Sequence, residues 1–511
     1  MTQSQEMVPR FFRAGLALFA AALPLAIYRY THDPTGEIKW LMVAWAGLAL
    51  GGGWLVFRRL FRLPAPGPRL FPELPAILAG MMVLSACARW GLDARAGGFP
   101  GGAVYLASQE AGRFIALLAL WYAAAQVIRS PAHLKGLLKA LCAAVFLTAV
   151  YALVQKAGLD PFPWGESPET MPSTFGNPNY AAHVLVVAVI AAAWLALEGW
   201  KPAWLLGLGA VWYLLNTGQR GGLAALAAGL GLLLVARLVR GKVRRPERAA
   251  ALSLALAALL AAVGAAALMG AMKARTGSAF PLDTSILLRY QSLTSASRMI
   301  MDRPLLGHGP GLYKMDNPAY WTPYEREYFA SESQYNHHVH NDPLEIGVDA
   351  GLVAAGAWLA LLVFAVGHAL VLAFSSEYRA GRRTGYALAA VFAAFAVDGL
   401  FGFNLRLPVS GALFFLLLGA LEGIASERAG APAPASAPAG PGWPLIACAL
   451  LLLAAQAAVA STQFASEYRL KTGLSAQEAG NRPLAAAQYR AGWRLSPWNW
   501  KFPWRLGQLA M

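Results

Sequence analysis

Apolar runs long enough to cross a bilayer recur along almost the whole chain, and this pattern constrains the fold more than any other feature. A membrane-spanning helix needs ~20 consecutive, mostly apolar residues. Only 13% of the 511 residues are charged, against roughly 25% in soluble domains. We therefore predict an all-α polytopic membrane protein. Thirteen spans are expected, at 14–28, 39–57, 70–88, 112–128, 137–155, 180–198, 203–216, 221–236, 250–270, 344–372, 385–402, 408–424 and 443–462.

The first apolar run follows Arg10 and Arg13, as the apolar core of a signal peptide would. No convincing small-residue cleavage site follows it, and many more spans do. We therefore expect a retained signal anchor. Each of the three cysteines lies within an apolar run, so neither a disulfide framework nor a thiolate metal site is indicated.

The net charge of +16 comes from basic residues in short connections between spans. Cytoplasmic loops of membrane proteins carry such an excess of Lys and Arg. With thirteen spans and a cytoplasmic N-terminus, all three basic clusters fall on the cytoplasmic side, so the charge indicates topology and not a nucleic-acid partner. The clusters are Arg58, Arg59, Arg62 and Arg69; Arg237, Arg240, Lys242, Arg244, Arg245 and Arg248; and Arg379, Arg382 and Arg383.

This topology divides the chain into two parts. Residues 1–462 form the expected transmembrane catalytic domain, with a large outer loop at 271–343. An Ala/Pro-rich linker at 429–442 is predicted to be cytoplasmic and flexible. Residues 463–511 form a helical tail on the outer side.

The tail fits part of the 34-residue tetratricopeptide pattern. Gly473, Ala485, Tyr489 and Pro497 occupy four of its positions. An ordinary amphipathic helical hairpin fits the same residues, and both interpretations stay open.

Ionisable residues from distant parts of the sequence converge on the outer face. They are Arg220, then Arg289, Arg298 and Arg303, then the "HHVHN" stretch that opens the tenth span. Arginine binds phosphate oxygens with a planar, permanently charged fork. A histidine that titrates near neutrality removes a proton from a hydroxyl group. The set suits a transfer to an alcohol with a phosphate or diphosphate leaving group. No ATP is present at an outer face, so the donor would be lipid-linked.

Each of these residues also has a structural interpretation. Arg220 could anchor a helix among lipid headgroups, and His340 could cap the tenth helix. His337, His338 and His340 could bind a metal. However, no Glu stands at metalloprotease spacing, and adjacent histidines do not point the same way on a helix. Neither a metal nor a cofactor is expected.

Four segments in this order resemble the motifs of the O-antigen ligase/O-antigen polymerase superfamily. They are "STFGNPNYAAH" (173–183), "QRGG" (219–222), "R…DRPLLGHGPG" (289–311) and "HVHNDPLEIGVDAGL" (338–352). The resemblance runs from about residue 173 to 424. It implies the large-loop architecture of C-type glycosyltransferases in the bacterial inner membrane, with the active site facing the periplasm. It also implies inverting, metal-independent glycan transfer from undecaprenyl diphosphate to an acceptor hydroxyl.

Carried over to this chain, the resemblance makes His340 the candidate general base and Arg220 and Arg289 the candidate diphosphate ligands. In a helix, the nine residues from Arg289 to Arg298 rotate by about 900°, so these two arginines should face opposite ways. The wider set of expected substrate-binding residues is His338, Asn341, Arg298, Arg303 and Asn179.

The chain departs from the family pattern at three positions. Leu293 and Pro343 replace residues that are often aromatic, and Asp349 replaces a frequent Glu. These differences concern acceptor recognition more than donor chemistry.

Three acceptors fit this chemistry: a lipid A-core sugar, the end of a growing polysaccharide, or a protein hydroxyl. The tail slightly favours the last two. An anion transporter is the alternative from another class, but paired interrupted helices in repeated halves are not evident. A scaffold for envelope assembly would leave the histidines unexplained.

Overall fold

The computed structural model describes residues 3–63, 73–95, 101–160, 162, 171–260, 284–331, 336–428 and 441–510, and every regular element in these ranges is a helix. In this part of the chain, ten helices or continuous helix runs are long and apolar enough to cross a membrane. They are α1 (Gln3–Leu25), α2–η1–α3 (Gly36–Leu60), α4 (Glu73–Arg95), α5 (Gly101–Val127), α6 (Pro131–Lys156), α7 (Pro178–Leu197), α9 (Arg220–Val239), α14 (Asp342–Ser375), α16 (Pro408–Arg428) and α17 (Trp443–Glu478).

The predicted class of a helical, multi-pass membrane protein is thus confirmed, whereas the count of thirteen spans is not. α8 (Ala203–Asn216) is apolar but has only 14 residues. α15 (Arg379–Asp398) has 20 residues, but its first two turns carry three arginines. The predicted span 250–270 is helical up to residue 260, and the rest of it lies outside the described residues. The linker prediction at 429–442 also falls almost entirely outside them.

α16 lies at the centre of the bundle, since 94% of its apolar stretch is buried. Two of its glycines let it approach α5 closely. A Cβ atom added to Gly419 would lie 2.4 Å from the carbonyl oxygen of Trp121, and one added to Gly423 would lie 2.4 Å from that of Ile128. Small residues allow such close approach of backbones in membrane helices.

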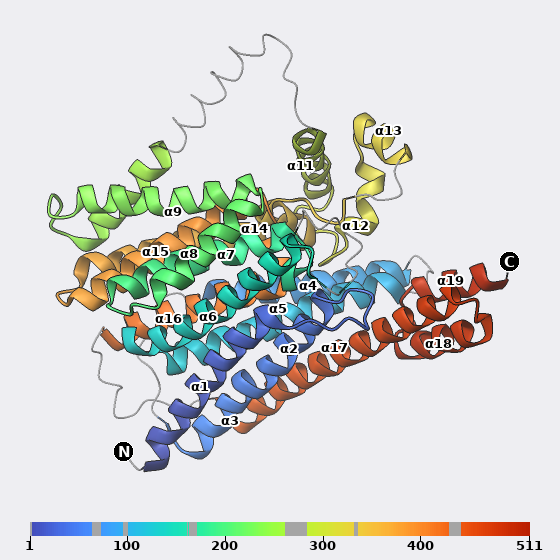
Figure 1. Ribbon diagram of the computed structural model, residues 1–511, viewed down its shortest axis with the longest axis horizontal. Helices are drawn as coiled ribbons and strands as arrows, with labels where there is room; N and C mark the ends of the chain where they lie inside the picture. The colour runs from blue at the N-terminus through green and yellow to red at the C-terminus, as the bar shows by residue number, and fades with distance from the viewer. Residues whose placement is uncertain are drawn as a thin grey trace, which may run out of the picture.

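One end of the bundle, here called the basic end, collects arginines and lysines from several helices. Arg383 of α15 and Lys135 of α6 both pair with Glu198, at 3.3 and 2.6 Å. Arg13 of α1 donates a hydrogen bond to the carbonyl of Val127 at 3.4 Å. The N-terminus lies at this end (Figure 1).

The opposite end, here called the site end, carries the short helices of the predicted outer loop and the C-terminal tail (Figure 1). The loop helices are α11 (Thr284–Asp302), α12 (Tyr313–Asp316) and α13 (Pro323–Ser331). Residues 271–283 and 332–335 of the predicted loop lie outside the described residues.

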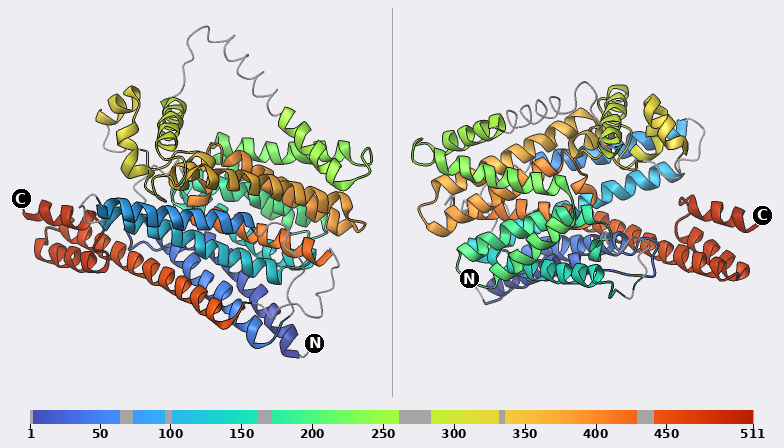
Figure 2. Two further views of the ribbon diagram at one scale, coloured as in Figure 1. Left: turned by 180° about the vertical axis from the view of Figure 1, so that it is seen from behind. Right: turned by 45° about the horizontal axis from the view of Figure 1, so that its top comes forward.

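α17 runs from the bundle into the tail, where α18 (Arg482–Leu495) folds back against it and α19 (Lys501–Ala510) packs on α18 (Figure 2). Three residues of the predicted repeat pattern meet here. Ala485 and Tyr489 are fully buried in the tail's apolar cluster. A Cβ atom on Gly473 would lie 2.4 Å from the Tyr489 ring. The tail is therefore a packed helical hairpin with a third helix, and its assignment as a tetratricopeptide repeat stays a prediction.

Candidate active site

A break in α14 anchors the outer segment to the membrane bundle. Gly351 has a φ of +83°, in the left-handed region that glycine adopts without strain. The break leaves backbone amide and carbonyl groups of α14 without helical hydrogen-bond partners, and the "PLLGHG" segment provides these partners. The amide of Leu352 donates to the carbonyl of Pro304 at 2.8 Å, and the amide of His308 donates to that of Val348 at 2.7 Å. Two of the sequence motifs thus form one joint.

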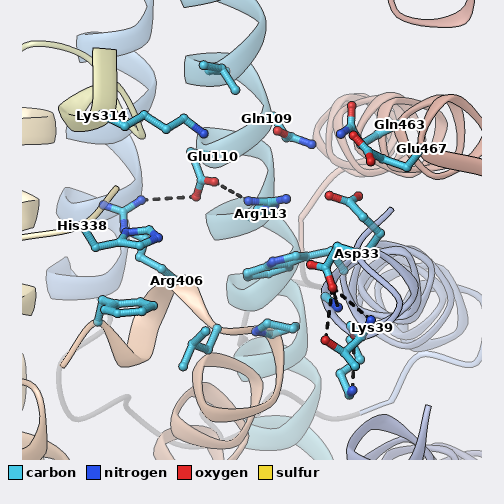
Figure 3. A pocket seen from close by; sticks show the side chains of 18 of the residues that line it. Asp33, Lys39, Gln109, Glu110, Arg113, Lys314, His338, Arg406, Gln463 and Glu467 are labelled. Atoms are coloured by element: carbon cyan, nitrogen blue, oxygen red, sulfur yellow. Dashed lines mark hydrogen bonds and ion pairs between the residues drawn. The ribbon is translucent and has the colours of Figure 1, made fainter. Parts of the chain in front are cut away.

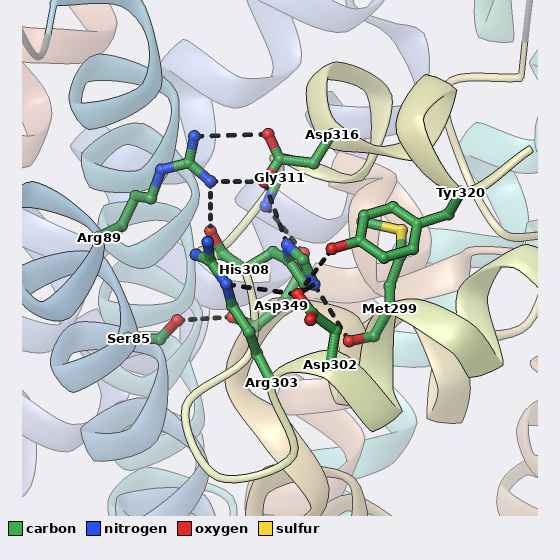
Figure 4. A network of polar contacts seen from close by, with 10 residues as sticks. All are labelled: Ser85, Arg89, Met299, Asp302, Arg303, His308, Gly311, Asp316, Tyr320 and Asp349. Carbon is green, nitrogen blue, oxygen red and sulfur yellow. Dashed lines mark hydrogen bonds and ion pairs between the residues drawn. The ribbon is translucent and has the colours of Figure 1, made fainter. Parts of the chain in front are cut away.

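Side chains reinforce this joint (Figure 4). Arg89 of α4 pairs with Asp316 at 2.5 Å and donates to the carbonyl of His308 at 3.2 Å. The His308 ring lies 3.1 Å from Asp316 and 3.0 Å from the carbonyl of Met299. Burial opposes ionisation of Asp316, but its hydrogen bonds with His308 and Arg89 hold its pKa below the usual range. His308, a motif residue to which no function was assigned, is part of this structural joint.

Asp349, one of the three departures from the family pattern, also belongs to the joint. Its carboxylate accepts a hydrogen bond from the amide of Gly311 at 3.0 Å and pairs with Arg406. The Ser85 hydroxyl donates to its backbone carbonyl at 2.6 Å. The side chain of Asp349 is fully buried.

Asn341, the residue between His340 and α14, is anchored by two hydrogen bonds. Asn341 caps the helix, since its side-chain oxygen accepts from the amide of Leu344 at 3.0 Å and its side-chain nitrogen donates to the carbonyl of Leu400 at 3.2 Å. His340 itself has a φ of +60°, which is uncommon for a residue other than glycine. Strained conformations of this kind cluster at functional sites.

Phe403 lies at the centre of the histidine cluster. Its ring stacks on His338 with centroids 4.1 Å apart, and His340 meets its ring at 5.1 Å in an edge-on arrangement. Tyr180 contacts it at 5.7 Å. Sequence reasoning missed Phe403, although "FGFNLRLP" (401–408) places aromatic and cationic residues between two apolar runs.

His338 is held by a buried carboxylate that the sequence did not reveal. Its Nδ1 lies 2.7 Å from Glu345, whose other oxygen accepts from the amide of Val339 at 3.0 Å. Arg406 lies 3.6 Å from Glu345 and pairs with Glu110 at 3.3 Å. Because these partners fix its ring, His338 presents its other nitrogen in one orientation.

His340 lies in a different electrostatic environment. Burial lowers its pKa to about 4, and the positive charge of Arg289 contributes to this shift. The imidazole is therefore neutral at neutral pH and able to accept a proton. His183 also acts electrostatically on His340, and its Nδ1 lies 2.6 Å from the Asp398 carboxylate. This second His–carboxylate pair was also missed.

Arg220 opens α9 beside the segment that supports His340. A Cβ atom on the next residue, Gly221, would lie 3.6 Å from the Phe401 side chain and 3.9 Å from the Asp398 carboxylate. Arg220 is exposed. The structure therefore brings the start of α9, His340 and His338 around the same 398–403 segment.

The remaining predicted site residues lie in other contacts. Arg298 donates to the carbonyl of Tyr320 at 3.4 Å, and Arg303 lies 3.8 Å from Asp302. Asn179 stands in the first turn of α7, next to Tyr180. Among the residues that the structure describes, no group of three His, Cys, Asp or Glu side chains is arranged to hold a metal ion.

A cavity of about 610 Å³ is lined by His338 and Phe403 but not by His340 (Figure 3). Arg406 and Glu110 line its inner wall, and residues of α17 and of the tail line the opposite side. Its volume is within the range of ligand-binding pockets, roughly 300–1,000 Å³.

The fold and this site define a multi-pass membrane protein with a polar, histidine-containing centre at one end of its bundle. Residues 203–359 match the family model described as O-antigen ligase. This match confirms the resemblance to the O-antigen ligase/polymerase superfamily that was drawn from the motifs. A comparison with curated proteins finds no match.

The matched range contains Arg220, Arg289, His338 and His340, but not Phe403 or the residues after it. The family implies a membrane enzyme of the glycosyltransferase type that acts on lipid-linked glycans.

Proposed function

We propose that the protein transfers a glycan from an undecaprenyl-diphosphate-linked donor to an acceptor hydroxyl at the periplasmic face of the inner membrane. The observation that carries this proposal is that His340, His338 and the start of α9 lie around the same 398–403 segment at one end of an apolar bundle, with the charge of Arg289 acting on His340. The basic end would face the cytoplasm, as the distribution of positive charge favours. A lipid-linked donor needs this boundary, because its tail lies in the bilayer and its diphosphate lies in water.

The proposed reaction is a single displacement. The acceptor hydroxyl gives its proton to His340, and its oxygen attacks the anomeric carbon of the donor sugar. The bond from this carbon to the diphosphate oxygen breaks, and undecaprenyl diphosphate leaves with the electron pair. Attack from the face opposite the leaving group inverts the anomeric centre.

Arg289 and Arg220 would hold the diphosphate and stabilise the charge that develops on it. Fixed cations are effective in this task because they need no reorganisation during the reaction. The two arginines would take the place of a divalent ion, so the proposed transfer is metal-independent. Binding of the diphosphate would also offset the charge of Arg289 and raise the pKa of His340 when the base is needed.

His338 is a second candidate for the base. Its pairing with Glu345 at 2.7 Å is the arrangement that orients a catalytic imidazole, and it lines the cavity. We favour His340 because the charge of Arg289, a proposed diphosphate ligand, acts on it. His338 and Asn341 would then position His340 and the acceptor.

The acceptor distinguishes three related activities: ligation to a lipid A-core sugar, polymerisation of a polysaccharide, and transfer to a protein hydroxyl. Ligation is the activity named by the matching family model. An anion transporter is the alternative from another class, and it predicts movement of solute without covalent product.

Reconstitution tests the proposal directly. The full chain is placed in vesicles with an undecaprenyl-diphosphate-linked oligosaccharide and candidate acceptors, and products are identified by mass spectrometry and their anomeric configuration by NMR. We expect an inverted glycosidic product that forms equally well after exhaustive chelation. A requirement for one restored metal would overturn the metal-free mechanism, and anion flux without product would favour the transporter.

A further inference from the structure

The C-terminal tail forms part of the cavity wall that faces His338. Gln463 and Glu467 project from α17 into the cavity, and the turn at 498–501 borders it from the same side (Figure 3). This turn meets the start of α5, where a Cβ atom on Gly102 would lie 3.7 Å from the carbonyl of Trp498. The tail therefore closes a space that the transmembrane helices alone leave open.

The tail contributes polar groups that protein partners do not fully satisfy. The Glu467 side chain is only 5% exposed, and one of its oxygens lies 3.6 Å from Lys501. Its other oxygen is buried and has no hydrogen-bond partner among the described residues. Buried carboxylate oxygens usually have partners, since leaving one unsatisfied is costly. This oxygen is therefore suited to accept a hydrogen bond from a ligand in the cavity.

The charges around the cavity nearly balance. Among the described residues that line it, five carry an ammonium or guanidinium group and four carry a carboxylate. Several are already paired, as Arg406 is with Glu110 at 3.3 Å. A polyanionic ligand would need a clear excess of cations, so the lining favours a ligand that is close to neutral.

Aromatic rings stand among these polar groups. Trp498 and Trp500 border the cavity from the tail, and Trp40, Tyr105 and Tyr180 border it from the bundle. A sugar ring offers apolar C–H faces to aromatic rings and hydroxyl groups that both donate and accept hydrogen bonds. This combination of flat rings and satisfiable polar groups matches a carbohydrate better than a lipid chain or a polyphosphate.

We propose that this cavity binds the acceptor, and that the acceptor is a near-neutral oligosaccharide whose specificity is set by the tail residues Glu467 and Trp500. Its end hydroxyl would lie beside His338 and Phe403, next to the base. The inference rests on the proposed glycan transfer and adds the acceptor class and the element that selects it. A protein acceptor is the competing outcome.

The test uses the reconstituted full chain with a lipid-diphosphate oligosaccharide donor. The acceptors are tagged neutral hexose oligomers, the same oligomers carrying phosphate groups, and a Ser/Thr-rich peptide. Glu467→Gln keeps the shape of the side chain but replaces the charged carboxylate by an amide, which is a weaker hydrogen-bond acceptor. Trp500→Ala removes an exposed ring. Matched controls are Glu478→Gln, an exposed residue of the same helix, and Trp504→Ala on α19 outside the cavity lining.

We expect neutral oligomers to be the preferred acceptors. Glu467→Gln should raise the acceptor KM about ten-fold, which is the size expected for weakening one hydrogen bond to a charged group. Trp500→Ala should raise it by a similar factor, because it removes the contact of an aromatic ring with the sugar. The donor KM should stay unchanged, and both controls should match the unaltered protein.

Two kinds of failure are distinguishable. If the unaltered protein transfers glycan but prefers the peptide or the phosphorylated oligomers, the inference about the acceptor is wrong and the proposed function stands. Unchanged acceptor KM values in both Glu467→Gln and Trp500→Ala would also overturn it. Absence of any glycosidic product, with any acceptor, would refute the proposed function itself.

Discussion

Two histidines stand two residues apart and both contact Phe403, His338 by stacking and His340 edge-on, but their surroundings differ in kind. His338 is fixed by the buried Glu345 at 2.7 Å and faces the cavity. His340 has its pKa lowered to about 4 by burial and Arg289. Residues that are close in the sequence therefore need not share a function. In our proposal His340 takes the proton of the acceptor hydroxyl, and His338 positions the acceptor.

The largest effect is expected from His340→Ala. Loss of a general base lowers the rate by roughly 10²–10⁴, and donor binding should stay close to normal. The measurement is single-turnover transfer in reconstituted vesicles, with donor binding measured separately. His337→Ala is the matched control, because this neighbouring side chain is exposed. A well-folded His340→Ala protein with normal transfer would return this histidine to a structural function at the helix start.

Arg289→Gln should have the next largest effect, since it removes charge from both the donor site and the surroundings of His340. Loss of one electrostatic donor in an active site costs about 10²–10³ in rate. Arg289→Lys should recover only part of the activity, because an ammonium group does not reproduce the bidentate fork. Donor affinity and rate should both fall. Full recovery with Lys would argue that Arg289 provides charge alone.

Arg298→Gln is the matched control for this substitution, because both arginines lie on α11. Arg298 donates to the carbonyl of Tyr320 at 3.4 Å. A loss of transfer as large as that of Arg289→Gln would contradict the assignment of the two helix faces.

His338→Ala should be milder than His340→Ala if His338 positions the acceptor. We expect a raised acceptor KM with a smaller fall in kcat. Glu345→Gln should reproduce this change and also lower stability, because a buried carboxylate that accepts two hydrogen bonds is worth about 1–3 kcal/mol. If His338→Ala lowers kcat more than His340→Ala does, the base is the His338–Glu345 pair.

The smallest effect is a shift in pH dependence. In the free enzyme His340 should be neutral above about pH 4, so the acid limb of kcat/KM should fall near this value. In the complex, the negative diphosphate offsets the positive charge of Arg289 and raises the pKa of His340. The acid limb of kcat should therefore lie at higher pH than the acid limb of kcat/KM. Arg289→Gln should move the free-enzyme limb upward, because it removes a charge that lowers the pKa. Identical limbs for both parameters would contradict this coupling.

The sequence alone predicted the membrane class well, because apolar runs of bilayer length leave few other folds. Local motifs also led to His340 and Arg289 as candidate site residues, and their roles stay a prediction. The count of thirteen spans was not confirmed, since α8 is short and α15 is rich in arginine at its start. Run length and apolarity alone do not decide such cases.

The missed residues share one physical cause. Arg406 and Glu110 are 296 positions apart, and His183 and Asp398 are 215 apart. Packing of α5, α7 and α15 brings these pairs together, and no local pattern encodes such contacts. A signal existed for Arg406, because an ionisable residue in a short connection between spans is costly and commonly functional. Asp349, which the sequence analysis connected with acceptor recognition, forms part of the joint at Gly351.

The most direct test of the account is transfer measured from one side of the membrane at a time. A membrane-impermeant tagged oligosaccharide is supplied outside right-side-out or inverted vesicles that contain the lipid-linked donor. We predict product only in right-side-out vesicles, where the site end faces the acceptor, and product in inverted vesicles only after they are made permeable. His340→Ala should abolish most of the product in right-side-out vesicles and in permeable inverted vesicles. Product in sealed inverted vesicles, or equal product from His340→Ala, would contradict the account.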